Sequence, residues 1–125
     1  MKQMQFNFNS TEPIYLQVAE QITEAIFARL YVAGDQVPST TEVSKKFHIN
    51  PATILKGMNL LVAQGLIEKR RGIGMFVTAD AYQKIVKDRK NEFYDQKIIG
   101  IVREAKKLGI AQAELINLIE RGFSN

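Results

Sequence analysis

The sequence predicts a mainly α-helical protein that carries one small β-hairpin. Apolar residues recur at helical spacing along most of the chain. Two short β-prone runs flank the stretch Gly72-Ile73-Gly74, which predicts the hairpin. A chain of 125 residues is long enough for one domain with a small appendage.

The first helix is expected to begin near Pro13, because proline suits a first turn and Thr11 or Glu12 can lie near the cap. Its inward positions follow at helical spacing: Tyr15, Val18, Ile22, Ala25, Ile26 and Leu30. The stretch 33–35 then predicts a turn, since it holds a glycine and an aspartate. Residues 1–10 are mostly polar, and we expect a flexible arm there.

Two further helices are expected with almost no chain between them. Ser39 and Glu42, three residues apart, form a capping box at the start of a short helix over 39–47. Asn50 can cap a second helix over 51–64, and the proline after it suits a first helical position.

The inward faces of these two helices follow from the same spacing. We expect them to hold Val43 and Phe47 on the first helix, and Ile54, Gly57, Met58, Leu61 and Val62 on the second. Glycine costs ~1 kcal/mol relative to alanine inside a helix. Gly57 therefore predicts a close approach by another helix.

The hairpin and the tail complete the architecture. The predicted order of elements is that of a winged helix-turn-helix: helix, helix, tight turn, helix and hairpin. From Ala79 the apolar spacing is helical to about Leu108, and a last helix ends near Gly122. We therefore predict a winged-helix DNA-binding domain over 1–78 and a two-helix dimerisation tail over 79–125.

Positive charge is concentrated in one third of the chain. The segment from Ser39 to Val77 holds six basic and two acidic residues, a net charge of +4 that equals the net charge of the whole protein. The rest of the chain is balanced. A localised basic patch favours a polyanionic partner. The basic residues are Lys45, Lys46, Lys56, Lys69, Arg70 and Arg71.

The second of the paired helices has the dimensions of a DNA-reading element. A helix is ~10–12 Å across and the major groove of B-DNA about 12 Å wide. Its leading end carries Asn50, Thr53 and Lys56. An asparagine can pair bidentately with adenine, a threonine offers a hydroxyl and a methyl, and a lysine reaches guanine or phosphate. As an isolated pair, Asn50 and Thr53 are also typical of a cap with a solvated neighbour.

Two further groups are candidates for phosphate contacts. Ser39, Thr40 and Thr41 begin the preceding helix, where free backbone N–H groups face an anion. Arg70, Arg71 and Gly72 form the wing, in which arginine suits a minor groove and glycine permits close approach. The alternative for both arginines is a solvated edge that prevents strand pairing.

Several classes of function are disfavoured. The chain has no cysteine and one histidine, so we expect no metal site and no cofactor. No nucleophile–base pair or carboxylate cluster predicts an enzyme. No apolar run approaches the ~20 residues that span a bilayer, so we expect no membrane association and a cytoplasmic location. A winged helix used as a protein-interaction or RNA-binding module stays as the alternative function.

Motifs spread over residues 13–77 resemble the N-terminal domain of GntR-superfamily transcriptional regulators. They are Pro13-Ile14-Tyr15-x-Gln17, Gly34-Asp35-x-Val37-Pro38-Ser39, Ile49-Asn50-x-x-Thr53-Ile54, Gly65-Leu66-Ile67 and Arg71-Gly72-x-Gly74-x-Phe76-Val77. The short helical tail looks like the YtrA-type subgroup. The resemblance implies a bacterial, dimeric, operator-binding protein, usually a repressor. It also implies DNA contacts by Ser39, Asn50, Thr53, Arg71 and Gly72.

The chain departs from the family pattern at two positions. The family usually has arginine at the position of Thr41 and often at that of Pro51. Direct reading of guanine is therefore expected to be weaker here, or to fall to Lys56.

The tail predicts a homodimer. Two helices cannot enclose a core of their own, since units of about 40 residues usually need oligomerisation or staples. The resemblance favours packing against a second copy, and a tail folded back on its own chain is the alternative. A two-fold dimer would place two reading helices roughly 34 Å apart on a palindromic double-stranded DNA operator. A small-molecule effector in the dimer cleft stays open, but no residue pattern points to one.

Overall fold

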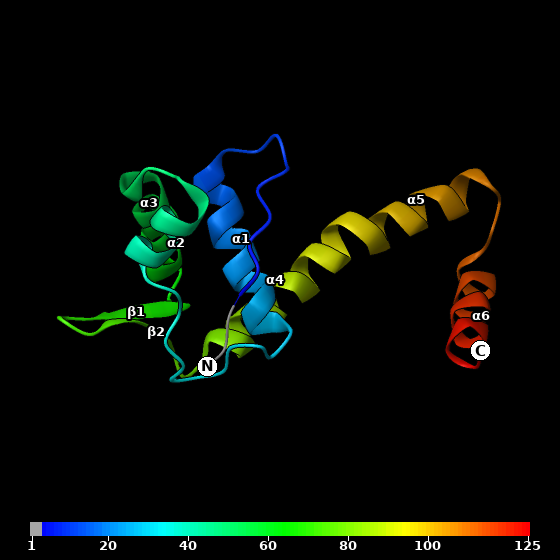
Figure 1. The fold of residues 1–125 in the computed structure, drawn as a ribbon. Coiled ribbons are helices and arrows are strands. Elements are labelled where there is room, and N and C mark those ends of the chain that lie inside the picture. Colours follow the sequence, from blue (N-terminus) through cyan, green and yellow to red (C-terminus); the bar gives the residue numbers. More distant parts are fainter. Residues whose placement is uncertain (1–3) are drawn as a thin grey trace. The chain divides into compact units, whose positions relative to one another are not determined.

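The computed structural model describes residues 4–125 and shows helices, a hairpin and further helices in the predicted order (Figure 1). Helix α1 spans Ile14–Phe27, α2 Thr40–Phe47 and α3 Pro51–Ala63, and strands β1 Ile67–Arg70 and β2 Gly74–Val77 pair antiparallel. Helix α4 Ala81–Glu92, the π-helical η1 Phe93–Ile98, α5 Ile99–Lys107 and α6 Gln112–Phe123 follow. The winged helix-turn-helix prediction is confirmed.

The chain divides into two compact units, of which the first ends at Val86 and the second begins at Lys87. The division therefore falls inside α4. Ala81 and Ile85 of α4, which the sequence analysis assigned to the tail, are buried in the core of the first unit. Shortening the chain after residue 78 would thus remove part of the winged-helix core.

The corner between α2 and α3 is set by local hydrogen bonds. The hydroxyl of Ser39 accepts from the backbone N–H of Glu42 at 3.0 Å, and Asn50 Oδ1 accepts from the N–H of Ala52 at 2.8 Å. Between the two caps, His48 adopts a left-handed conformation with φ +56°. The hydroxyl of Ser44 then donates to the carbonyl oxygen of Ile49 at 2.6 Å, which closes the turn. The caps at Ser39 and Asn50 are confirmed, and of the predicted capping box the structure shows the half in which Ser39 accepts.

The core of the first unit forms where α1 meets α3. Val18, Ile22, Ile54 and Leu61 are all fully buried there. Gly57 lies at the contact: a Cβ on it would come within 2.6 Å of a backbone oxygen in α1, that of Tyr15. The predicted close approach is therefore confirmed. Leu30 and Val62 were expected to point inward but are exposed. Leu30 lies beyond the end of α1, at Phe27.

A flexible arm was expected over residues 1–10. This expectation is wrong for residues 4–10, and residues 1–3 lie outside the described part of the chain. Phe6 and Phe8 stack with their ring centroids 5.5 Å apart, and both meet the ring of Phe47 on α2 edge-on. The N–H of Asn7 donates to Gln21 Oε1 on α1 at 2.8 Å, and Gln21 Nε2 donates back to the Asn7 carbonyl oxygen at 2.6 Å. The arm is thus bound to α1 and α2.

A segment before α2 extends the hairpin. The N–H of Val37 donates to the carbonyl oxygen of Met75, and the N–H of Val77 donates to that of Asp35, both at 2.9 Å. Gln36 forms an isolated antiparallel bridge with Phe76. The sequence predicts only a turn in this region, because the pairing joins residues about forty positions apart.

The second unit has little interior of its own. Between Lys87 and Asn125, Ala105 is the one buried residue in the described chain. The sequence predicted one uninterrupted helix from Ala79 to about Leu108, but η1 interrupts it. A π-helical turn holds more residues than an α-helical turn, a difference that apolar spacing does not reveal. Among residues 4–125, no helix has both the length and the apolar character needed to cross a membrane.

Candidate nucleic-acid interface

The start of α2 presents three small hydroxyl side chains. Ser39 and Thr40 are half-buried, whereas Thr41 is exposed. Ser39 caps the helix through its hydroxyl oxygen. The first backbone N–H groups of a helix have no intrahelical acceptor, so those of Thr40 and Thr41 can donate to a phosphate.

The start of α3 carries Asn50 and Thr53. Asn50 is exposed and Thr53 is half-buried one turn along the helix. The side-chain oxygen of Asn50 already accepts the cap hydrogen bond from Ala52. A bidentate contact to adenine needs both that oxygen, as an acceptor, and the side-chain NH2 group, as a donor. The cap occupies one lone pair of the oxygen, so the NH2 group and the second lone pair are the parts of the side chain that can contact a base.

Lys56 has an unexpected partner. Its Nζ lies 4.0 Å from the centroid of the Tyr15 ring on α1, a cation–π contact. The position of Lys56 in the sequence predicts an ammonium that extends toward DNA. In the structure it covers the α1–α3 contact, so it would have to leave the ring to reach a base or a phosphate.

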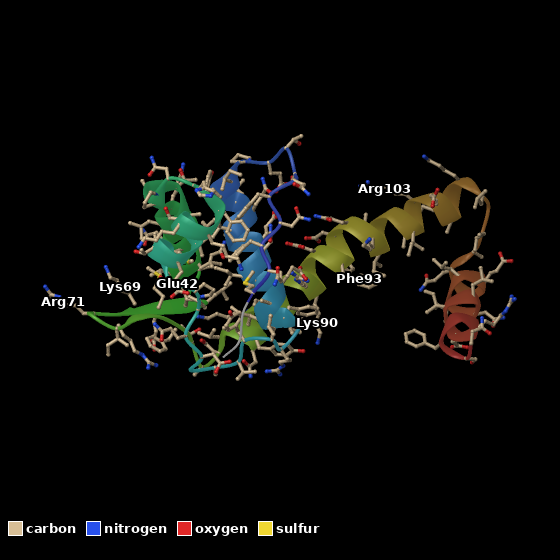
Figure 2. All side chains as sticks on the ribbon, in the orientation of Figure 1. Glu42, Lys69, Arg71, Lys90, Phe93 and Arg103 are labelled. Carbon is tan, nitrogen blue, oxygen red and sulfur yellow. The ribbon has the colours of Figure 1, made fainter. Side chains whose placement is uncertain are left out.

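The wing holds its two arginines differently. One Nη of Arg70 lies 3.2 Å from Glu68 Oε1, and its guanidinium carbon lies 4.1 Å above the Phe76 ring centroid. Lys69 and Arg71 extend from the same side of the hairpin, with Arg71 at its tip (Figure 2). Gly72 completes the tip with φ +76°. The wing thus presents one arginine held against the sheet and one directed into solvent.

These elements enclose a groove of 340 Å³ within the first unit. Four of the predicted DNA-contact residues line this groove, together with one further residue of the basic patch. The four are Ser39, Thr40, Arg70 and Gly72, and the fifth residue is Lys69. The other predicted contacts, Thr41, Asn50, Thr53, Lys56 and Arg71, do not line the groove. The structure therefore brings the α2 start and the wing together at one groove, and places the α3 start and Arg71 outside its lining.

Among the groove residues that were not predicted from the sequence, three have notable side chains. Leu55 and Ile73 are exposed apolar side chains in its lining, and Gln36 donates from Nε2 to the carbonyl oxygen of Ile73 at 3.0 Å. This bond ties the segment before α2 to the wing tip. No sequence signal identifies Gln36, because its role depends on the pairing of residues 34–37 with β2. Ile73 could have been noticed as an apolar residue at a polar hairpin tip.

The described chain holds no cluster of metal-ligating side chains. Among residues 4–125, no group of three histidine, cysteine, aspartate or glutamate side chains is placed to hold a metal ion. The polar groups around the groove are hydroxyls, amides, ammonium and guanidinium groups, which bind anions and base edges. Fold and site together define a winged-helix DNA-binding protein.

The chain belongs to the family described as bacterial regulatory proteins, gntR family, which it matches over residues 14–77. It is 32% identical over 117 residues to the HTH-type transcriptional regulator YhcF of Bacillus subtilis (strain 168), covering 94% of this chain and 95% of that protein. It is 29% identical over 93 residues to the HTH-type transcriptional repressor YtrA of the same organism, covering 74% and 72% of the two chains. The protein is therefore a GntR-family transcriptional regulator and not an enzyme.

Solved structures show the same architecture. The crystal structure of a GntR-family regulator from Bacteroides thetaiotaomicron superposes with a TM-score of 0.70 at 28% identity, covering 89% of this chain and 96% of that one. The DNA-binding domain of AraR, solved in complex with the operator ORE1, superposes with a TM-score of 0.52 at 30% identity over 61% and 93% of the two chains.

Proposed function

We propose that this regulator is a repressor that binds a palindromic operator as a homodimer. One observation carries the proposal: the hydroxyls at the α2 start and the cations of the wing line a single groove. The repressor YtrA and the operator complex of the AraR domain support it. Binding of DNA would place the protein in the bacterial cytoplasm. The nucleic-acid alternative, single-stranded RNA, is disfavoured because aromatic stacking platforms do not line the groove.

The DNA contacts divide into two classes. We assign backbone contacts to Ser39, Thr40 and Thr41 at the α2 start and to Arg70, Arg71 and Gly72 in the wing, since N–H groups and guanidinium groups suit phosphate oxygens. Base reading falls to Asn50 and Thr53, which begin the helix that would enter the major groove. Lys56 joins them once its ammonium leaves the Tyr15 ring.

The homodimer is proposed from the second unit. Of the fifteen large apolar side chains exposed in the described chain, nine lie between Phe93 and Phe123. Exposed apolar surface of this extent marks an association site. A second copy is the occupant we propose, because two-fold symmetry buries the same surface on both subunits and sets two reading helices on one duplex.

Selection of bound sites from random duplexes tests the proposed function. The recovered sequences should contain inverted half-sites with centres about 10–10.5 bp apart, or a multiple of that spacing. Recovery of single, unpaired half-sites would contradict the homodimer, and no enrichment at all would contradict operator binding.

Arg71→Ala is expected to weaken binding to all duplexes by about tenfold or more at 0.1 M salt, because one phosphate contact is lost in each subunit. The plot of log affinity against log salt concentration should become shallower by about one unit per subunit, and therefore by about two units for the homodimer. Arg103→Ala, which removes the same charge from the second unit, is the matched control and should leave the slope unchanged. An unchanged slope in Arg71→Ala would contradict a phosphate contact at the wing tip.

Asn50→Ser is expected to reduce the preference for a selected operator over random DNA by ~1–3 kcal/mol. Serine keeps an oxygen for the α3 cap, so the free energy of unfolding should change little. Competition binding assays on both duplexes measure the preference, and Thr53→Ala is expected to act in the same direction. Equal losses on the two duplexes would show that neither side chain reads bases.

A further inference from the structure

The tip of the wing carries an apolar side chain, that of Ile73. Ile73 is 64% exposed, more than any other large apolar side chain described in the first unit. It lines the groove between the α2 start and the wing, and Leu55 of α3 lines the same groove. Single exposed apolar side chains are common on protein surfaces, so the place of Ile73 and the way in which it is held decide what it can bind.

Hydrogen bonds hold the main chain of Ile73 on both sides. Its N–H donates to the carbonyl oxygen of Arg70, and its own carbonyl oxygen accepts from Gln36 Nε2, each at 3.0 Å. Glycine suits the next position, because a Cβ on Gly74, where φ is +141°, would lie 2.5 Å from Gln36 Nε2. The wing tip is therefore in place before a partner arrives, which lowers the cost of binding.

The surroundings of Ile73 suit the backbone of a DNA strand. Lys69 and Arg70 line the groove beside the hydroxyls of the α2 start, and no acidic side chain of the described chain lines it. The wing lies on the other side of this groove from α3 (Figure 1). In a duplex, the backbone of a strand separates the major groove from the minor groove. With α3 in the major groove and a strand backbone beside it, the wing tip therefore meets the minor groove.

The chemistry of the minor groove makes an apolar tip selective. The edges of A·T and G·C pairs differ there by the N2 amino group of guanine, a hydrogen-bond donor. The side chain of Ile73 has no acceptor, so it would displace water from that amino group without replacing the hydrogen bond, which is unfavourable. An A·T pair places the apolar C2–H of adenine at the same position, and the side chain can pack against it.

We propose that Ile73 enters the minor groove and selects A·T over G·C pairs there, because an apolar side chain cannot satisfy the guanine amino group. Ile73 thus adds a second sequence-reading contact to those of Asn50 and Thr53 at the α3 start. This role rests on the function proposed above, since a duplex must occupy the groove.

A base-pair scan of a selected operator tests the role of Ile73. Each A·T pair is replaced in turn by G·C and by inosine–cytosine, which keeps the major-groove edge of G·C but lacks the amino group. At pairs roughly 5 bp, half a helical turn, from those that α3 reads, G·C should weaken binding by about fivefold or more. Inosine–cytosine should bind there within about twofold of A·T, because the minor-groove donor is absent. At the pairs that α3 reads, inosine–cytosine should behave like G·C.

Ile73→Ser replaces the apolar side chain by a hydroxyl that can accept from the amino group. The variant should lose the difference between G·C and inosine–cytosine, to less than about twofold. Its urea unfolding midpoint should stay unchanged, since the side chain is exposed. Leu55→Ala is the matched control, because it removes another exposed apolar side chain of the groove, on α3. It should retain the full difference between the two pairs.

The remaining outcomes separate Ile73 from its neighbour and from the proposed function. Arginine in a narrow minor groove also favours A·T-like pairs, so a difference that Ile73→Ser keeps and Arg71→Ala loses would overturn the role of Ile73. Equal binding of the wild type to G·C and inosine–cytosine at every position, or a selected operator with G·C at the wing position, would overturn it while operator binding stands. A chain that binds no duplex would overturn both proposals.

Discussion

Ile116→Asp is expected to make the protein monomeric and to lower its affinity for a palindromic operator by ~100-fold or more, because the second half-site then no longer binds intramolecularly. Ile116, Ile119 and Phe123 lie at helical spacing on one face of α6, and all three are exposed in the single chain. A carboxylate placed in an apolar interface loses its hydration without gaining a partner. Sedimentation measures the assembly, and titration of a selected operator measures the affinity.

Asn117→Asp is the matched control, since it adds a carboxylate to α6 at a position about 100° around the helix from Ile116 and outside this face. It should remain dimeric and bind the operator normally. A dimeric Ile116→Asp, or an equally monomeric Asn117→Asp, would show that this face of α6 is not the interface. Substitution is preferable to truncation after Val77, because a cut there would also remove Ala81 and Ile85 from the core.

Gly57→Ala is expected to lower the free energy of unfolding by about 1–3 kcal/mol, the usual cost of overpacking. A Cβ there would lie 2.6 Å from the Tyr15 carbonyl oxygen and 3.0 Å from Val18 Cβ. The first of these neighbours is backbone and cannot rotate away, so α1 and α3 must separate. This cost should exceed the ~1 kcal/mol that alanine gains over glycine from helix propensity. Urea unfolding of the full chain measures the change.

Gly100→Ala, inside α5, is the matched control with the opposite expected sign. A Cβ at that position meets nothing within 4 Å, so only the propensity gain of up to ~1 kcal/mol should appear. If Gly57→Ala proved as stabilising as Gly100→Ala, the tight α1–α3 contact would be contradicted.

The parts of the fold that the sequence predicted well depend on neighbouring residues. The caps at Ser39 and Asn50, the corner between α2 and α3, and the hairpin around Gly72 each result from interactions within a few positions. Gly57 predicted a distant contact because glycine inside a helix is otherwise unfavourable. Such signals are local and therefore visible in a single sequence.

The features that sequence analysis missed depend on distant pairs. Phe6 and Phe8 looked like isolated rings in a polar arm, and only the position of Phe47 makes them a cluster. Residues 34–37 pair with β2 across about forty positions. In both cases the partner is chosen by the folded chain, and no periodicity within either segment identifies it.

The same distinction applies to the candidate interface. Its residues were selected by chemical type, and the structure places several of them around one groove. Their present hydrogen bonds and contacts were not predictable: the cap uses the Asn50 oxygen, and the Tyr15 ring holds the Lys56 ammonium. Chemical type predicts what a side chain can bind, while its neighbours decide which of its atoms are available.

The stacked rings of Phe6 and Phe8 also bear on how the chain matures during synthesis. Their partner Phe47 is translated thirty-nine positions after Phe8. At ribosomal speeds of about 5–20 residues per second, that is a delay of roughly 2–8 s. During this interval both rings lack their eventual neighbour and are available to chaperones. The nascent polypeptide can bury these rings against the winged helix only after α2 has emerged from the ribosome.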